Sequence, residues 1–412
     1  MSMTSRERVL KALNFEQVDR LPRDLGGMAS TGISAFAYPA LVEALGLPPR
    51  LPRIHDSYQM LALPEMDVLE ALGCDVVTVF WGATNAFDEP TKWHRYDFNG
   101  RLPAMVRDIK QFVNLPDGSI SQPHLNCIMG LTAVVFNEEH AGQLFDISAD
   151  LPKPDLKIVK KEQQESLPKD RDIKEMVELC RRVRNSTDKA VFFNGPVNTG
   201  IAIASPGGCA VWPMVCLTEP QFVAEYHGLM TEYAVKRLDL LLKEIAPYID
   251  ILMTASDDWG TQNALFAPPR IFEELFLPYL KKFNGHIKKV APNVKRFLHS
   301  CGAIYDIIDL IIDSGFDVLN PIQWSAGGRS YKQWKDKCRG RIAMWGGGVN
   351  SQETLPFGTV QDVKREVAEV TAYLAKDSGF VFNSIHNLLA ETKPEKIIAM
   401  YREASDTKRK DC

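Results

Sequence analysis

From residue 189 onward, short apolar runs alternate with longer amphipathic segments. The apolar runs are continuous and rich in β-branched and aromatic residues, which is typical of strands buried on both faces. They are KAVFFNGP (189–196), IDILMTASDDWG (249–260), KRFLHSCG (295–302), FDVLNPIQW (316–324), RIAMWGGGV (341–349) and GFVFNSIHN (379–387). Strands that alternate with helices predict right-handed βαβ units and a parallel sheet.

The amphipathic segments predict helices, because apolar residues recur in them every three or four positions. The predicted helices are 5–14, 56–73, 219–245, 269–290, 303–314, 359–375 and 394–404. Thr4 and Glu7 have the spacing of a capping box at the start of the first helix.

Two more strand candidates lie near the N-terminus. RLPRDLGG (20–27) ends in glycines, and CDVVTVFWG (74–82) is a continuous apolar run. Eight strands with intervening helices predict an α/β fold, a (β/α)8 TIM barrel that spans residues 1–412 as a single domain. Residues 83–188 break the rhythm, so we expect an insertion there between the second and third strands, with a hairpin at Asp117-Gly118.

Polar residues gather at the C-terminal ends of the predicted strands. In a barrel these ends share one mouth, where active sites lie. The residues are Asp24, Asn194, Asp257, Asp258, His299, Cys301, Asn320, Gln323, Asn350, Asn383 and His386. We therefore expect distant parts of the sequence to converge on one cavity.

His299 and Cys301 have the spacing that lets a strand present two side chains on one face, so imidazole and thiol can bind the same ion. Catalytic zinc sites use three such protein ligands and keep a fourth position open. His386, at the end of the last strand, can supply the third ligand. The alternatives are a buried cysteine beside a hydrogen-bonded histidine, and a His386 that serves as general acid, binds substrate or bonds to the backbone.

Asp257, Asp258 and Gln262 follow the fourth strand in the segment DDWGTQ. One carboxylate can face the pocket while the other caps the next helix, and paired acids can raise one pKa. The alternative is that both acids cap the helix and bind backbone. Aromatic residues near strand ends or in the N-terminal loop can line an aryl-ether pocket or pack in the core: Phe36, Tyr38, Trp81, Trp259, Trp324 and Trp345.

The composition excludes several classes of function. The chain has 412 residues, 45% of them hydrophobic, and a net charge of −4. No basic stripe indicates a nucleic-acid partner, and no apolar run is long enough to span a membrane. The N-terminus lacks an apolar signal segment, so we expect a cytoplasmic protein whose eight cysteines are thiols.

Four segments resemble the uroporphyrinogen decarboxylase superfamily, which includes the corrinoid-dependent methyltransferases. They are TSRERVLKALNFEQVDRLPRD (4–24), DDWGTQ (257–262), HSCG (299–302) and FVFNSIHNLLAETKPEKIIAMYREA (380–404). The likeness covers nearly the whole chain outside 83–188. It implies a (β/α)8 barrel, in agreement with the strand count.

The branches of this superfamily differ at two places. True decarboxylases carry an arginine-rich motif that grips the porphyrinogen carboxylates. Here that place reads RDLGGMASTG, in which Arg23 is at most a remnant, so uroporphyrinogen is not the expected substrate. The methyltransferase branch carries H-x-C on the fifth strand and a cysteine on the eighth, all three binding zinc. His299 and Cys301 match this pattern, whereas His386 stands where that last cysteine would, and where the decarboxylases carry a histidine.

The resemblance implies a zinc-dependent methyltransferase that moves a methyl group between a small substrate, such as a methyl ether or thiol, and a corrinoid protein. Zn²⁺ would act as a Lewis acid, and the cobamide would arrive on that separate protein. The assigned residues are His299, Cys301 and His386 for the metal; Asp24, Asp257, Asp258 and Asn320 for catalysis; and Tyr38, Trp259, Gln262, Gln323 and Asn383 for the substrate.

Two alternatives stay open. One is a metal-free decarboxylase or lyase of the uroporphyrinogen decarboxylase type, acting on a small carboxylate, in which His386 and Asp24 or Asp257 handle protons. The other is a non-catalytic barrel that binds a small molecule or a partner. A homodimer is also considered as the assembly.

Overall fold

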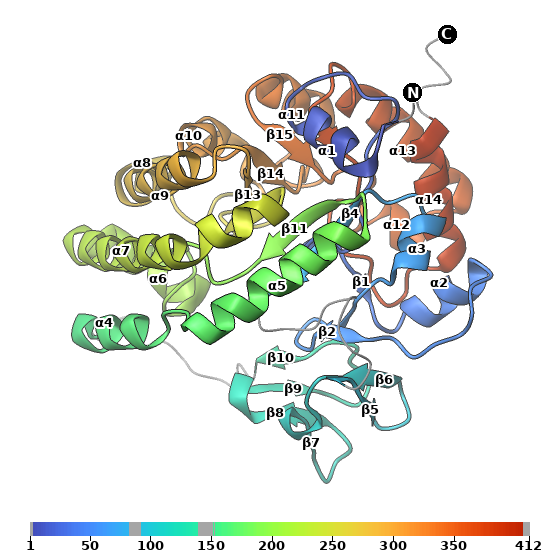
Figure 1. Ribbon diagram of the computed structural model, residues 1–412, viewed down its shortest axis with the longest axis horizontal. Coiled ribbons are helices and arrows are strands. Elements are labelled where there is room, and N and C mark those ends of the chain that lie inside the picture. The colour runs from blue at the N-terminus through green and yellow to red at the C-terminus, as the bar shows by residue number, and fades with distance from the viewer. Residues whose placement is uncertain (1–2, 82–91, 139–150, 152, 407–412) are drawn as a thin grey trace.

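A curled parallel sheet forms the centre of the protein in the computed structural model, which describes residues 3–81, 92–138, 151 and 153–406 (Figure 1). Seven strands pair in the order β16-β15-β14-β13-β12-β11-β4, and every pair is parallel. Their bounds are β4 (Val76–Phe80), β11 (Ala190–Asn194), β12 (Ile251–Ser256), β13 (Lys295–His299), β14 (Val318–Asn320), β15 (Ala343–Trp345) and β16 (Phe380–Val381).

Residues 22–24 take the place of the eighth strand and close the sheet. On one side, the Phe382 N–H donates to the Pro22 carbonyl at 2.8 Å and the Asp24 N–H donates to the Phe382 carbonyl at 2.9 Å. On the other side, the Asp75 N–H donates to the Arg23 carbonyl at 2.7 Å. The predicted (β/α)8 barrel is therefore confirmed, with its first strand reduced to a short extended segment.

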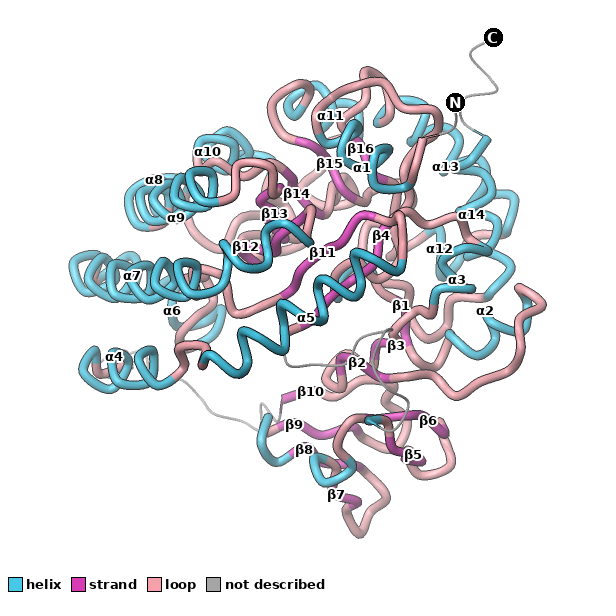
Figure 2. Tube along the Cα trace, viewed as in Figure 1, coloured by secondary structure: helices cyan, strands magenta, loops and turns pink. Residues whose placement is uncertain are grey.

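Helices cover the outside of the barrel (Figure 2). Their bounds are α1 (Ser5–Leu13), α2 (Tyr38–Ala44), α3 (Met66–Ala71), α4 (Leu156–Glu165), α5 (Asp170–Ser186), α6 (Gly208–Thr218), α7 (Pro220–Ile245), α8 (Pro269–Leu275), α9 (Leu277–Val290), α10 (Ile308–Asp313), α11 (Tyr331–Cys338), α12 (Thr354–Phe357), α13 (Val360–Leu374) and α14 (Pro394–Asp406). Helix α1 begins with the predicted capping box of Thr4 and Glu7. Its Val9 and Leu13 join the apolar cluster inside the barrel.

Two helix predictions need correction. The span 56–73, predicted as one helix, contains β2 (Ile54–Asp56) and β3 (Leu61–Ala62), and only α3 is helical. Pro64 is the physical reason, because proline disfavours helical geometry in the residue before it and has no N–H to donate. Strand β3 pairs with β2 and with β1 (Ile33–Ser34) in a small antiparallel sheet.

The span 269–290 is divided into α8 and α9 at Phe276. Pro278 follows within the first turn of α9, a position where its missing N–H costs nothing. No helix among the residues that the structure describes is both long enough and apolar enough to cross a bilayer.

Two small antiparallel sheets lie within the span 83–188. One is the pair β5 (His94–Asp97) and β6 (Pro103–Val106). The other contains β7 (Val113–Asn114), β8 (Ile120–Gln122), β9 (Cys127–Met129) and β10 (Asn137–Glu138). Strands β7 and β8 confirm the hairpin predicted at Asp117-Gly118. The parts of the span at 83–91, 139–150 and 152 lie outside the described residues.

A buried carboxylate fastens the closing segment of the barrel. The side chain of Asp75 is fully buried and accepts hydrogen bonds from the guanidinium groups of Arg8 and Arg20, at 2.7 Å from each. It also accepts the backbone N–H of Arg23 at 3.0 Å. A carboxylate without these donors would be costly to bury, so the four residues stabilise the structure as a unit.

We expect Asp75→Ala to lower the free energy of unfolding by about 3–5 kcal/mol, because it removes the shared acceptor of Arg8, Arg20 and the Arg23 N–H. Asp19 then remains the carboxylate bound to Arg8. Asp309→Ala is the matched control. The Asp309 side chain is 57% exposed and pairs with Arg341 and Lys337, so its loss should cost about 0–1 kcal/mol. Urea denaturation measures both variants, and equal losses in the two would contradict a special role for Asp75.

Candidate metal centre

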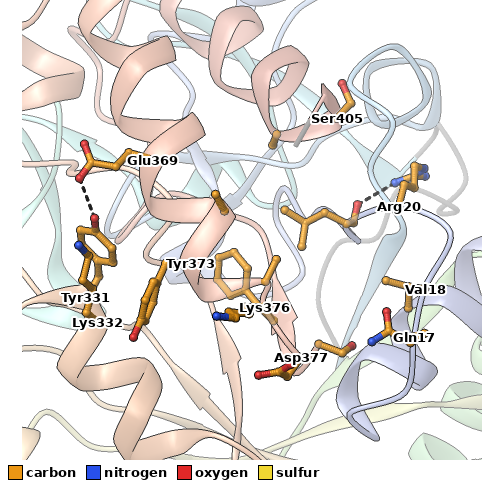
Figure 3. Close-up of a pocket in the computed structure, with 16 residues that line it drawn as sticks. Gln17, Val18, Arg20, Tyr331, Lys332, Glu369, Tyr373, Lys376, Asp377 and Ser405 are labelled. Atoms are coloured by element: carbon orange, nitrogen blue, oxygen red, sulfur yellow. Dashed lines mark hydrogen bonds between the residues drawn. The ribbon is translucent and has the colours of Figure 1, made fainter. Parts of the chain in front are cut away.

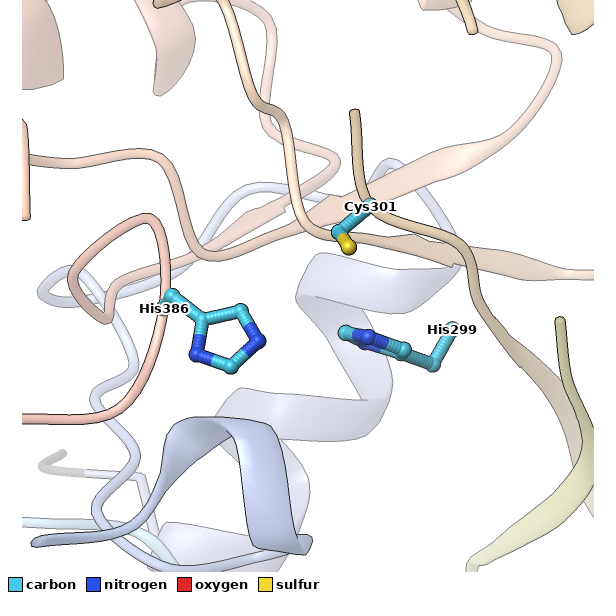
Figure 4. Close-up of side chains that lie close together, drawn as sticks. All are labelled: His299, Cys301 and His386. Carbon is cyan, nitrogen blue, oxygen red and sulfur yellow. The ribbon is translucent and has the colours of Figure 1, made fainter. Parts of the chain in front are cut away.

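Two neighbouring parts of the barrel mouth bring three metal-binding side chains together (Figure 4). His299 is the last residue of β13, and Cys301 follows two positions later on the same face. His386 lies beyond β16, which the closure of the barrel places within reach. The ligand atoms of His299, Cys301 and His386 all lie within 4.8 Å of one another. This geometry agrees with the predicted set of three ligands.

His299 is held by its Nδ1 atom. That atom lies 2.6 Å from the Oδ1 atom of Asn320, whose Nδ2 group donates to the Trp345 carbonyl at 2.9 Å. Because the Asn320 Nδ2 group donates to Trp345, the Asn320 Oδ1 atom is the one that faces His299. The His299 Nδ1 atom therefore carries a proton and donates it to Asn320 Oδ1. The Nε2 atom, which faces the Ser30 hydroxyl at 3.3 Å, is then the nitrogen available to a metal.

His386 has the same arrangement in a different loop. Its Nδ1 atom lies 2.7 Å from the Oδ1 atom of Asn387. The Nδ2 group of Asn387 donates to Gln59 at 3.2 Å, which fixes the amide in the same sense. Both histidines therefore direct Nε2 away from their carboxamide partner, as metal-binding histidines do.

Asp258 is the carboxylate nearest to these ligands. Its Oδ1 atom accepts the backbone N–H of Cys301 at 2.9 Å and lies 3.4 Å from the Nε2 atom of His299. Burial by itself raises the pKa of Asp258, but the hydrogen bond and charge of His299 outweigh burial and hold the pKa well below its ordinary value. Burial lowers the pKa of His299, yet Asp258 raises it overall.

Burial and the charge of Asp258 raise the pKa of the Cys301 thiol. Without a metal the Cys301 thiol thus keeps its proton, and the Asp258 carboxylate favours a proton on the His299 imidazole. A metal ion must displace the protons of both ligands, so its affinity depends on pH.

Asp257 points away from the three ligands. Its side chain is buried, where it accepts the Ile203 N–H at 2.8 Å and the Trp259 indole N–H at 2.5 Å. Burial raises the pKa of Asp257 to about 8. Asp257 and Trp259 connect the loops after β11 and β12, and we place neither of them against the metal ligands.

The remaining predicted residues mainly hold loops in place. Gln323 accepts the Gly302 N–H at 2.7 Å, and Gln262 donates to the Ser325 carbonyl at 2.7 Å. Asn383 donates to the backbone carbonyl of Asp24 at 2.8 Å. These bonds fix the mouth of the barrel around the ligands.

Tyr38 is not brought to this group. It is fully buried at the start of α2, where its hydroxyl group donates to Glu65. Conversely, Ser30, Asn387 and Gln59 contact the ligands or their partners and were not predicted. Of these three residues, Asn387 alone could have been suspected from the sequence, because it directly follows His386.

A cavity of about 580 Å³ lies at the other end of the barrel, near the amino-terminal ends of β16 and of the closing segment (Figure 3). Tyr331, Tyr373 and Arg20 line it, and the Tyr331 hydroxyl donates to Glu369 at 2.7 Å. It contains none of the predicted site residues. That end of a barrel serves stability rather than catalysis.

Comparison with known proteins identifies the family. The family model for uroporphyrinogen decarboxylase (URO-D) matches residues 100–406, about three quarters of the chain. The chain belongs to the uroporphyrinogen decarboxylase family. This result confirms the resemblance seen in the sequence.

The curated relatives in this family are distant. Uroporphyrinogen decarboxylase of Psychromonas ingrahamii is 25% identical over 181 residues, which is 43% of this chain and 46% of that protein. Uroporphyrinogen decarboxylase 2, chloroplastic, of Oryza sativa is 26% identical over 149 residues, 36% of this chain and 35% of that protein. The matched part thus spans less than half the length of these relatives.

A solved structure supports the same fold over the full length. A methyltransferase from Methanosarcina mazei superposes with a TM-score of 0.52 and 16% sequence identity, covering 98% of this chain and 99% of that chain. At this identity the likeness concerns the fold.

In this chain, Arg23 lies away from the mouth of the barrel. Its buried guanidinium donates to the Tyr401 carbonyl at 3.1 Å and packs against Gly73. Asp24, the next residue, has its side chain against the indole N–H of Trp345 inside the barrel. Because successive residues of an extended segment face opposite ways, Arg23 lies on the outer side. It cannot grip a carboxylate in the mouth.

Asp24 predicts a pH dependence of stability. Burial raises the pKa of Asp24 to about 6, although Gly27 and Trp345 donate to it. An unfolded aspartate titrates near pH ~3.9, so between about pH 4 and 6 the folded chain binds the extra proton. Stability contributed by this residue therefore falls as pH rises through that window, by about 3 kcal/mol in total.

Asp24→Asn cannot titrate and serves as the reference. We expect the difference in unfolding free energy between the native chain and Asp24→Asn to change steadily from about pH 4 to pH 6 and then level off. Urea denaturation across this range measures the difference. A difference that stays constant with pH would show that Asp24 titrates normally.

Proposed function

We propose that this chain is a zinc-dependent methyltransferase that moves a methyl group between a small substrate and a corrinoid protein. One observation carries the proposal: the donor atoms of His299, Cys301 and His386 lie within 4.8 Å of one another at the catalytic end of a barrel. The superfamily, which includes such methyltransferases, supports it.

The donor set suits zinc. Two imidazole nitrogens and one thiolate are ligands that zinc prefers, and three protein ligands leave a position open for a substrate. The amides of Asn320 and Asn387 hold the two imidazoles in the tautomer that exposes Nε2. This match in ligands and in their supporting contacts is the basis for assigning zinc rather than a metal that favours oxygen ligands.

A zinc ion held by His299, Cys301 and His386 would supply Lewis acidity toward the heteroatom of the methyl donor or acceptor. The chain's own residues supply position and proton handling. Asp258, whose side chain is 49% exposed, lies 3.4 Å from the His299 Nε2 atom and can therefore take up or return a proton on the heteroatom of a substrate beside that ligand. The cobamide is brought by a separate corrinoid protein that binds at the mouth.

A metal-free decarboxylase or lyase is the second candidate, and the family model favours it. In that case His386 and the carboxyl group of Asp24 would handle protons. Metal content separates the two candidates, because only the first needs an ion at His299 and Cys301.

Zinc binding is tested with three variants. Protein purified without chelators should carry about one zinc per chain. Cys301→Ser should lose most of it and the methyl-transfer activity, and His386→Ala should weaken binding, while both keep the fold. Cys209→Ser is the matched control, because Cys209 is an exposed thiol outside the ligand set. It should retain the metal.

Elemental analysis and circular dichroism give these results directly. An active native chain that contains no metal would contradict the proposal and favour the lyase. Loss of zinc from Cys209→Ser as strongly as from Cys301→Ser would contradict the assigned ligand set.

A second test concerns the substrate. The arginine that could remain from the porphyrinogen motif, Arg23, is buried on the outer side of the barrel. We therefore expect no conversion of uroporphyrinogen to coproporphyrinogen by the purified protein, measured by chromatography of the oxidised porphyrins. An authentic family decarboxylase in the same assay is the positive control, and turnover by this chain would refute the expectation.

A further inference from the structure

A chain of side-chain hydrogen bonds runs from the end of β2 to the metal ligand His386. The Nε2 group of Gln59 donates to the Oδ2 atom of Asp56 at 3.1 Å. The Oε1 atom of Gln59 accepts the Nδ2 group of Asn387 at 3.2 Å, and the Oδ1 atom of Asn387 lies 2.7 Å from the Nδ1 atom of His386. Gln59 and Asn387 are 328 positions apart in the sequence, so these bonds exist only in the folded protein.

The direction of these bonds is set at the Asp56 end. A carboxylate can only accept hydrogen bonds, whereas a carboxamide can be turned over so that its donor and acceptor exchange places. Because Asp56 accepts, the NH₂ group of Gln59 faces it and the Gln59 oxygen faces Asn387. The Asn387 oxygen then faces His386, so the proton of the neutral ring is held on Nδ1 and Nε2 is left free for a metal.

The carboxylate of Asp56 is itself held in one orientation. Its Oδ1 atom accepts the backbone N–H groups of Tyr58 and Gln59, each at 2.9 Å, and Oδ2 is the oxygen left for the Gln59 side chain. Asparagine makes the same turn as aspartate, with its oxygen on the backbone N–H groups. An asparagine at this position would therefore direct its NH₂ group toward Gln59, and the acceptor at the end of the chain of bonds would become a donor.

The second histidine has an equivalent support that ends on the backbone. Asn320, the partner of His299, donates to the Trp345 carbonyl at 2.9 Å, and a carbonyl oxygen is likewise only an acceptor. No side-chain substitution can convert that carbonyl into a donor. A change at Asp56 should therefore act on His386 and leave His299 as an internal reference.

The loop that carries His386 is fixed by backbone bonds of its own. The Ile385 N–H donates to the Val349 carbonyl at 3.0 Å, and the Leu388 N–H donates to the Gly32 carbonyl at 2.9 Å. These bonds involve no member of the side-chain chain. Reversal of the amides should therefore change the donor and acceptor that face the ring without moving the backbone of the loop.

We propose that Asp56 is a positioning residue for the metal site: its carboxylate sets the direction of the Gln59 and Asn387 amides and so keeps the Nε2 atom of His386 free to bind zinc. This inference rests on the proposed function, because it takes His386 as a ligand of the metal. It also gives a role to the small antiparallel sheet, which places Asp56, the last residue of β2, within reach of the loop after β16.

The test compares three forms of the full chain: the native protein, Asp56→Asn and the double variant Asp56→Asn/Gln59→Glu. In Asp56→Asn the amides should reverse and the proton of His386 should move to Nε2, so zinc affinity should fall by about tenfold to a hundredfold. The double variant exchanges the positions of the acid and the amide. Its carboxylate at position 59 can accept from position 56 and from Asn387, so the native tautomer and most of the affinity should return.

Two measurements give the result. Nitrogen-15 chemical shifts of the His386 ring report its tautomer in the metal-free chain at about pH 8, where a histidine with an ordinary pKa of ~6.5 is neutral. Zinc affinity is measured by competition with a chelator. Asp117→Asn is the matched control, because Asp117 accepts the Ser119 N–H at 2.9 Å in the β7–β8 hairpin, outside this chain of bonds. It removes the same charge and should change neither measurement.

An unchanged His386 tautomer in Asp56→Asn would overturn the inference, whether or not the chain binds zinc. A double variant that behaves like Asp56→Asn would also overturn it, because the direction of the bonds would then not be what the carboxylate controls. If the native chain binds no zinc and Asp56→Asn still shifts the tautomer, the proposed function fails and the role of Asp56 in orienting His386 stands.

Discussion

The barrel depends on one short closure. Residues 22–24 join the two edges of the sheet, β4 and β16, through backbone hydrogen bonds of Pro22, Arg23 and Asp24. This short segment replaces a full strand. The buried carboxylate of Asp75 holds this segment by accepting the Arg23 N–H along with two guanidinium groups. The candidate metal centre needs the closure, because β16 delivers His386 and the segment after Asp24 delivers Ser30 to His299, a residue of β13.

The barrel was predictable because its strands are buried on both faces and so appear as continuous apolar runs. The span 56–73 was not, since its apolar residues fit both a helical and an alternating pattern. Leu61 and Ala62 form strand β3 there, and Pro64 was the one local signal against a helix. Strand β3 has only two residues, which is too short for an alternating pattern of apolar and polar residues to be recognised in the sequence.

In the candidate site, too, the features set by local strand geometry were predictable, and those set by contacts between loops were not. The i, i+2 spacing of His299 and Cys301 sufficed to place both ligands on one face, because strand geometry alone decides it. Neighbouring Asp257 and Asp258 could not be assigned in this way, since they point in opposite directions, one to Ile203 and one to Cys301. The partners that set the histidine tautomers come from other loops, and such contacts exist only in the folded chain.

The carboxyl groups near the barrel mouth differ in pKa according to whether a group that can carry positive charge faces them. Asp24 and Asp257 are buried without a cation beside them, and burial raises the pKa of each. Asp258 has a lowered pKa because it faces the His299 imidazole, whose hydrogen bond and charge outweigh burial. The charge of the mouth is thus concentrated in the pair of Asp258 and His299. A metal that takes the Nε2 atom of His299 replaces that proton with its own charge, so the carboxylate keeps a cationic neighbour. The pair can therefore accept a metal without creating an unpaired buried charge.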